Sequence, residues 1–124
     1  MADLAQDLAI DLQEDQPGTL ARAVEAIARA GINIEGYAEV EGILHVLTKD
    51  ALRARRAVEA AGLAVREERT VLLYPIEDRP GALAALLRRI ADAGVNVNFS
   101  YVAASNRIVL GAEDLAKARE VVAV

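Results

Sequence analysis

The sequence predicts an α+β protein built from two copies of one βαββαβ unit in tandem. The first observation is a repeat, in which Glu14-Asp15-Gln16-Pro17-Gly18 returns as Glu77-Asp78-Arg79-Pro80-Gly81, a shift of 80 − 17 = 63 residues. The same shift carries Gly31-Ile32-Asn33-Ile34 to Gly94-Val95-Asn96-Val97, and it needs no gap from Leu8 to Ala61. The second observation is that apolar residues in each copy recur first at two-residue steps and then at three- to four-residue steps, as strands and helices require.

The first copy begins with an expected strand, because Leu8, Ile10 and Leu12 alternate with other residues. A Pro-Gly turn ends this strand, and an apolar stripe at helical spacing then runs to Gly31, where we expect the helix to stop. Asp50 is expected to cap the second helix. The remaining elements are expected as a second strand from Ile32 to Val40, a turn at Glu41-Gly42, a third strand from Ile43 to Thr48, a helix from Ala51 to Ala61 and a fourth strand that contains Leu63 and Val65.

The second copy repeats this order but stops before its fourth strand. Its expected elements are a strand from Thr70 to Ile76, a helix from Ala82 to Ala93, a strand from Val95 to Ala104, a turn at Ser105-Asn106, a strand from Arg107 to Gly111 and a helix from Glu113 to Val122. Nothing follows that corresponds to Leu63–Glu67, so one sheet edge needs a cover. A partner chain or a strand shared between the copies would provide it.

This order of elements predicts two ferredoxin-like units, each an antiparallel sheet with two helices on one face. We expect the domains to span residues 1–69 and 70–124. The first strand of the second copy is apolar on both sides, with Val71 and Leu73 on one and Leu72 on the other. This pattern indicates either that another sheet or subunit covers the second face or that the strand is merely apolar.

Composition excludes several classes of function. The net charge of −5 argues against nucleic-acid binding, and the four aromatic residues are too few for base stacking. There is no Cys, no apolar run of membrane-spanning length and no signal peptide pattern, so we expect a cytoplasmic protein that does not bind membranes. We expect no cofactor and no metal site, and we interpret the single histidine, His45, as a structural or surface residue.

The repeated turn is the strongest candidate for chemistry. The first backbone N–H groups of a helix have no intrahelical partners and favour an anion such as a carboxylate. Gly18 and Gly81 would let a ligand approach the backbone, and Asp15 and Asp78 could hold an ammonium group. Together with the amides of Asn33 and Asn96, which can donate and accept, these groups would suit a free α-amino acid.

Each part of this pattern also has a structural interpretation. Asp15 could simply cap the helix, and Pro-Gly could simply turn the chain. Asn33 and Asn96 each follow a helix-ending Gly, where Asn is also a turn residue. For either turn alone the structural interpretation is preferred, and the recurrence of both features at one offset favours a ligand site.

The motif D-x-P-G-x-L followed by A-G-I/V-N-I/V, inside βαββαβ, resembles the ACT domain in both copies. The resemblance covers nearly the whole chain and implies a tandem ACT protein, a regulatory protein that binds amino acids where two such domains meet. It places the ligand between the loop after the first strand, the start of the first helix and the second strand of a neighbouring domain. The ligand-binding residues that it implies are Asp15, Gln16, Gly18, Thr19, Leu20, Asn33, Asp78, Arg79, Gly81, Ala82, Leu83 and Asn96. Tyr37 and Tyr101 could line the pocket for the ligand's side chain.

The sequence contains no arrangement of residues that indicates catalysis, so we do not expect an enzyme. We expect a homodimer that senses a free amino acid at an inter-domain interface and acts allosterically on a separate metabolic enzyme. The alternative is a ligand-free ACT-like module for protein–protein assembly. A small enzyme of ferredoxin-like build is a further reading, for which the sequence offers no polar cleft.

Overall fold

The computed structural model describes residues 2–13 and 16–123, which form four helices and six strands. They divide into two compact units, one of residues 6–69 and the other of residues 2–5 and 70–123. The elements are β1 (Asp3–Asp11), α1 (Thr19–Arg29), β2 (Gly36–Val40), β3 (Ile43–Leu47), α2 (Ala51–Ala60), β4 (Ala64–Pro75), α3 (Ala82–Asp92), β5 (Val97–Ala103), β6 (Arg107–Ala112) and α4 (Leu115–Val122). None of the helices in the described residues is long and apolar enough to cross a membrane.

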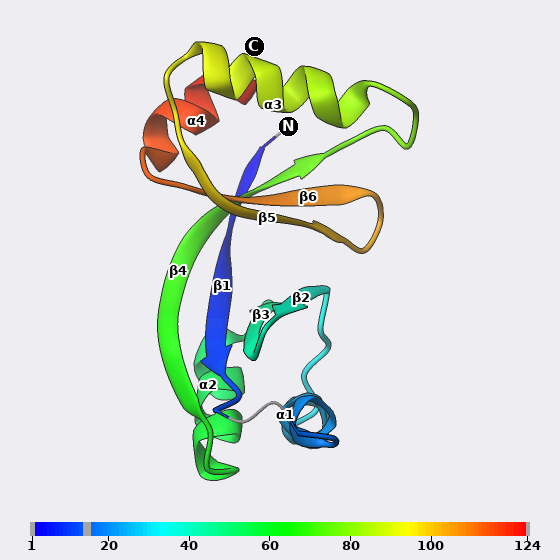
Figure 1. Cartoon of the computed structure of the whole chain (residues 1–124), viewed down its shortest axis with the longest axis vertical. Coiled ribbons are helices and arrows are strands. Elements are labelled where there is room, and N and C mark those ends of the chain that lie inside the picture. The colour runs from blue at the N-terminus through cyan, green and yellow to red at the C-terminus, as the bar shows by residue number, and fades with distance from the viewer. Residues whose placement is uncertain (1, 14–15, 124) are drawn as a thin grey trace. The chain divides into compact units, whose positions relative to one another are not determined.

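In the first unit, β3 lies between β1 and β2 and pairs antiparallel with both. Both helices, α1 and α2, lie on the same face of these strands (Figure 1). The alternation in β1 turns Leu8 and Ile10 toward the helices, where they are fully buried with Ile27 of α1 and Val58 of α2. The expected period-two strand and amphipathic helices therefore bury their apolar sides against each other.

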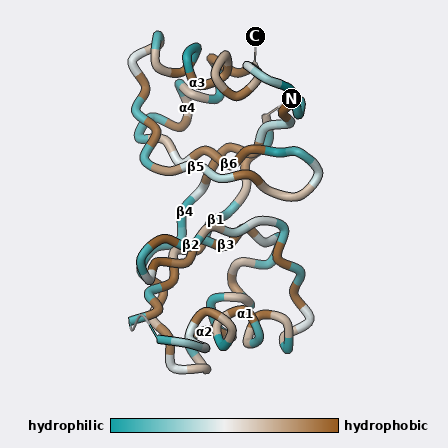
Figure 2. Tube along the Cα trace, turned by 45° about the vertical axis from the view of Figure 1, so that its right-hand side comes forward, coloured by the Kyte–Doolittle hydropathy of each residue, from teal (hydrophilic) through white to brown (hydrophobic). Residues whose placement is uncertain are grey.

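The second unit has the same plan. Its β6 pairs antiparallel with β4 and with β5, and α3 and α4 lie together on one face (Figure 1). Leu72 of β4 and Leu110 of β6 pack in the core with Leu86 and Ile90 of α3. Along the traces of the helices, hydrophobic and hydrophilic residues follow one another in short runs, as one buried side requires (Figure 2).

The boundary between the units falls inside strands. The sequence predicts two separate strands around residues 63–67 and 70–76, but β4 runs unbroken across Arg69 and Thr70, where the units divide. Backbone pairing keeps the chain extended here even though the run Arg66–Arg69 is charged and lacks an apolar pattern. The two expected strands are therefore one.

The N-terminal residues group with the second half of the chain. Residues 2–5 group with residues 70–123 and not with 6–69, and Ala2, 7% exposed, belongs to the second unit's core. The first part of β1 thus contributes strand residues to the second unit.

The strand that is apolar on both sides is also buried on both sides. Leu72 faces the helices, while Val71 and Val109, outside that core, are fully buried as well. Leu73 is 9% exposed. Residues on both sides of this strand are therefore buried.

The two hairpins form at the predicted turns. Glu41 and Gly42 both have positive φ, as do Ser105 and Asn106, which is the backbone of a tight two-residue hairpin. In contrast, the second strand of the first unit is shorter than predicted, because β2 begins at Gly36 and not at Ile32. The residues before Gly36 form a loop, of which Ile32 packs into the core.

Candidate functional site

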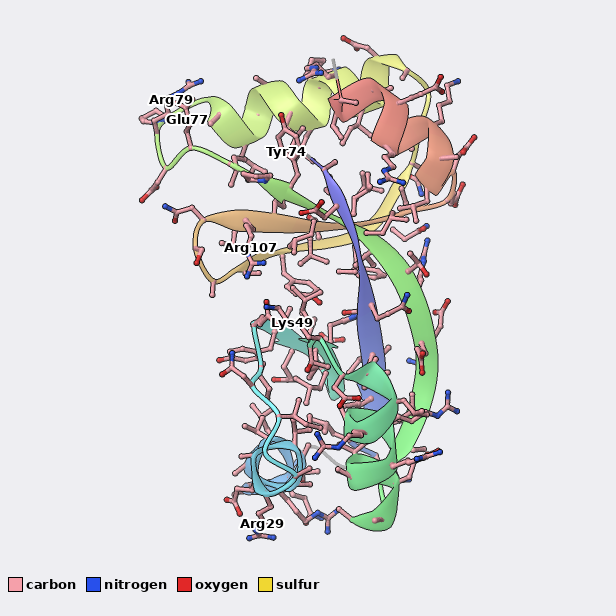
Figure 3. The ribbon with its side chains drawn as sticks, turned by 180° about the vertical axis from the view of Figure 1, so that it is seen from behind. Arg29, Lys49, Tyr74, Glu77, Arg79 and Arg107 are labelled. Atoms are coloured by element: carbon pink, nitrogen blue, oxygen red, sulfur yellow. The ribbon has the colours of Figure 1, made fainter. Side chains whose placement is uncertain are left out.

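The start of α3 is the better defined of the two predicted turns. Gly81 is the N-cap residue and adopts a left-handed conformation with φ 88°, which an L-residue with a side chain disfavours. Its carbonyl accepts the first helical hydrogen bond from Ala85 N at 2.9 Å. In the turn before it, Arg79 Nε donates to Glu77 Oε2 at 2.6 Å, and both side chains project from the chain where α3 begins (Figure 3).

The helices that follow the repeated turns begin differently from the other two. The N-cap residues of α2 and α4, Asp50 and Asp114, accept hydrogen bonds from backbone N–H groups of the first turn at 3.2 and 3.0 Å. The N-cap residues of α1 and α3, Gly18 and Gly81, offer no side-chain acceptor, and neither helix has an acidic residue in its first turn. The first helical N–H groups, those of Thr19 and Ala82, donate to the carbonyls of Gln16 and Arg79 at 3.4 and 3.3 Å, and no side chain caps the positive end of either macrodipole.

A cavity of about 180 Å³ lies beside the start of α3. It is lined by Ile76, Glu77, Asp78, Arg79, Leu83, Val102, Asn106 and Ile108. The predicted residues Asp78, Arg79 and Leu83 thus face one space together with residues of the β5–β6 hairpin. Two further predicted residues belong to the same turn: Gly81 is the N-cap residue of α3, and Ala82 is its first helical residue.

A second cavity, of about 500 Å³, lies at the start of α1. Its lining residues are Leu12, Gln13, Gln16, Pro17, Gly18, Thr19 and Arg22. Gln16, Gly18 and Thr19 are among the predicted ligand-binding residues, and the predicted Leu20 follows them as the second residue of α1. Asp15 was also predicted, but it lies outside the described residues.

The two asparagines lie away from the turns of their own units. Asn96 precedes β5, just after α3, so the 11 residues of α3 separate it from Gly81, a span of about 16 Å. Its amide Nδ2 donates to Glu113 Oε1 at 3.3 Å, as does that of Asn98. Asn33 is exposed in the loop between α1 and β2. The expected convergence of turn and asparagine therefore does not occur within one unit, because the helix holds them at opposite ends.

The two tyrosines differ in exposure. Tyr37, on β2, is 58% exposed, whereas Tyr101, on β5, is 8% exposed and stacks on Phe99 with ring centroids 6.3 Å apart. Neither tyrosine lines the cavity at the turn of its unit. Their role as pocket-lining residues stays a prediction for a site formed with another domain.

His45 has an acidic partner that the sequence did not reveal. Its Nδ1 lies 2.9 Å from Oδ2 of Asp7, whose side chain is 1% exposed. The residues are 38 positions apart and are joined because β1 and β3 pair, with Ala9 opposite His45. The structural interpretation of His45 is consistent with this pair.

The sequence also did not reveal the cavity residues Val102, Asn106 and Ile108. They come from β5, β6 and the hairpin between them, and only the folded sheet brings them to the turn after β4. The repeat contains one indication of these residues. At the offset of 63 residues, the apolar Val102 and Ile108 occupy positions where the first copy has the polar Glu39 and His45. Asn106 was identified only as a turn residue.

Known structures resemble the chain over its full length. No protein-family model matches the sequence, and no curated protein matches it significantly. The structure of protein BT0572 from Bacteroides thetaiotaomicron superposes with a TM-score of 0.86 at 29% identity, covering 98% of this chain and 88% of that one. The regulatory subunit of aspartate kinase from Thermus flavus has a TM-score of 0.72 at 19% identity, covering 99% and 94%.

The ligand-free regulatory subunit of aspartate kinase from Thermus thermophilus has a TM-score of 0.70 at 23% identity, covering 99% of this chain and 93% of that one. Both of these neighbours are regulatory subunits. The chain therefore has the ACT-like α+β fold found in regulatory subunits of aspartate kinase.

Proposed function

We propose that the chain is a regulatory protein of two ACT-like domains, which binds a free amino acid and modulates a separate metabolic enzyme. The observation that carries this proposal is the repeated glycine-capped helix start, each beside a cavity. The domains of the proposal are residues 6–69 and residues 2–5 with 70–123. An aspartate kinase catalytic subunit is the first candidate partner, because two of the similar structures are regulatory subunits of that enzyme.

The amino acid would be held by its two charged groups. Its carboxylate would accept hydrogen bonds from the first N–H groups of α1 or α3, which favour an anion. Its ammonium group would pair with a carboxylate of the turn, such as Asp78. Because Asn96 lies at the far end of α3, an asparagine amide would come from a neighbouring domain or from a second copy of the chain.

Such a shared site explains how binding could regulate. A ligand that touches two domains stabilises the arrangement that holds them together, and it shifts the population by its difference in affinity for the two arrangements. The same coupling would alter the affinity for an enzyme bound to one arrangement. We accordingly propose a homodimer without catalytic activity of its own.

A thermal-shift screen of all twenty amino acids tests this proposal. A ligand at 100 times its Kd raises the free energy of unfolding by about 2.7 kcal/mol, a shift of several degrees for a protein of this size. We expect at least one amino acid to raise Tm at millimolar concentration. The absence of any shift, checked by calorimetry, would overturn amino-acid sensing.

A double variant then tests the asparagines. Asn33→Ala with Asn96→Ala should remove the response to the ligand while Tm without ligand changes little, because both side chains are exposed. Asn98→Ala is the matched control, since Asn98 donates to the same Glu113 oxygen but lies outside the repeated motif. Equal responses of the double variant and the wild type would refute the role of the asparagines.

The second candidate is a ligand-free assembly module. It is favoured by β2, where the apolar side chains of Tyr37 and Val40 are 58% and 68% exposed. Under this alternative, Tyr37→Ser would weaken the association with a partner protein, and added amino acids would have no effect on that association. The screen described above separates the two candidates.

A further inference from the structure

The two cavities at the repeated turns have different chemistry. Four apolar side chains line the α3 cavity, from Ile76, Leu83, Val102 and Ile108. At the offset of 63 residues, the corresponding residues of the first copy are Gln13, Leu20, Glu39 and His45, of which Gln13 lines the α1 cavity. Three of the four apolar positions are thus polar or charged in the other copy, although the turn itself is repeated.

The apolar residues that line the α3 cavity range from buried to exposed. Ile108, on β6, is 2% exposed, whereas Leu83 on α3 and Val102 on β5 are 43% and 63% exposed. When a ligand covers exposed apolar side chains, its free energy of binding becomes more favourable in proportion to the apolar area removed from water. The site therefore favours an apolar group of the ligand between α3 and the β5–β6 hairpin.

Polar groups surround this apolar surface. Asp78 contributes a negative charge, the Glu77–Arg79 ion pair contributes one charge of each sign, Asn106 contributes an amide, and the N-terminus of α3 adds backbone N–H groups. Opposite charges next to one another match the ammonium and carboxylate of a zwitterion. The volume of about 180 Å³ equals that of roughly six waters at about 30 Å³ each, which suits a single amino-acid side chain.

Among the residues that the structure describes, the α1 cavity has no such surface. Its lining includes the polar Gln13, Gln16 and Thr19 and the cation Arg22, and its apolar residues are Leu12, which is 4% exposed, and Pro17 of the turn. An apolar side chain placed there would remove water from these polar groups without pairing them, which costs free energy. The duplicated turns therefore do not provide two equivalent sites.

We infer that the α3 site selects a free L-amino acid with an aliphatic side chain, such as valine, leucine, isoleucine or methionine, and that the α1 site does not bind this class. This inference rests on the proposed function and adds to it the class of ligand. It also makes one ligand per chain the expected stoichiometry for aliphatic amino acids.

Calorimetry on the full chain tests the inference with these four amino acids and with serine, aspartate and lysine as probes. We expect an aliphatic amino acid to bind most tightly, with one site per chain. Val102→Glu introduces the residue found at this position of the first copy and should weaken that binding at least about tenfold. Val102→Ser, which adds no charge, should act in the same direction.

Leu52→Glu is the matched control. Leu52 lies on α2, is 55% exposed and is remote in sequence from both cavities, so the same new charge should leave the affinity unchanged. Unchanged Tm values without ligand would show that the variants are folded.

If serine, aspartate or lysine binds best, or if Val102→Glu binds as the wild type does, the inference is overturned while amino-acid sensing stands. If no amino acid binds at all, the proposed function fails with it.

Discussion

The ring of Phe99 on β5 lies directly over Gly111, its cross-strand partner on β6. A Cβ atom at position 111 would overlap three carbons of that ring. Because the ring also stacks on Tyr101, it has little freedom to move aside. We therefore expect Gly111→Ala to lower the free energy of unfolding by about 1–3 kcal/mol, measured by denaturant titration.

A double-mutant cycle identifies the cause of this loss. In a Phe99→Ala background the ring is absent, so Gly111→Ala should cost clearly less than in the wild type. Equal costs in both backgrounds would mean that the backbone of β6, and not the ring, needs glycine. The stacked pair would then be incidental to the choice of residue 111.

The Asp7–His45 pair gives a second prediction. His45→Ala removes a partner at 2.9 Å from a carboxylate that is 1% exposed, and the cost is about 1–3 kcal/mol because a buried polar group loses a hydrogen bond. His45→Asn, whose amide nitrogen can replace Nδ1 as a donor, should recover part of this loss. The comparison is made by urea denaturation at neutral pH, and identical stabilities of the two variants would argue against the hydrogen bond.

The cap of α4 provides a third prediction. Asp114 accepts a hydrogen bond from Lys117 N at 3.0 Å, so Asp114→Ala should cost about 1 kcal/mol. Asp114→Asn keeps a good capping side chain and should remain within a few tenths of a kcal/mol of the wild type. A cap that contributes nothing would leave the thermal unfolding of all three proteins alike.

The first residues of the chain give a fourth prediction. Deletion of residues 1–5 removes strand residues and Ala2 from the second unit, so amide hydrogen exchange should rise mainly in residues 70–123. Leu4→Ser is the control, because this side chain is 48% exposed and its loss should change little. A rise confined to residues 6–69 would contradict the grouping of the N-terminal residues.

Apolar periodicity was sufficient to predict most elements of the fold. Helix α3, expected from Ala82 to Ala93, forms from Ala82 to Asp92, and Asp50 caps α2 as predicted. The continuity of β4 could not be predicted, because charged residues interrupt its pattern and only pairing with other strands keeps it extended. Residues 2–5 were likewise expected in the first unit, because they are next to the first repeat in the sequence and their strand pairing cannot be seen there.

The candidate site was predictable only in its local parts. The glycine caps at Gly18 and Gly81 follow from the Pro-Gly turns, since the backbone there has positive φ. The distance from Gly81 to Asn96 depends on the length and direction of α3, and the contribution of Val102 depends on how β5 and β6 pair. These are relations between elements, which a short motif does not contain.

The passage of β4 from one unit into the other without a loop has a consequence for how the protein can vary. Domain boundaries usually tolerate insertions, because the chain there is an exposed linker. Between Arg69 and Thr70, one added residue would instead reverse the facing of every later side chain in the strand. Leu72 would then exchange sides with Val71 and Leu73, so a single residue added at the joint between the two repeats would have to be absorbed by a β-bulge to keep the core intact.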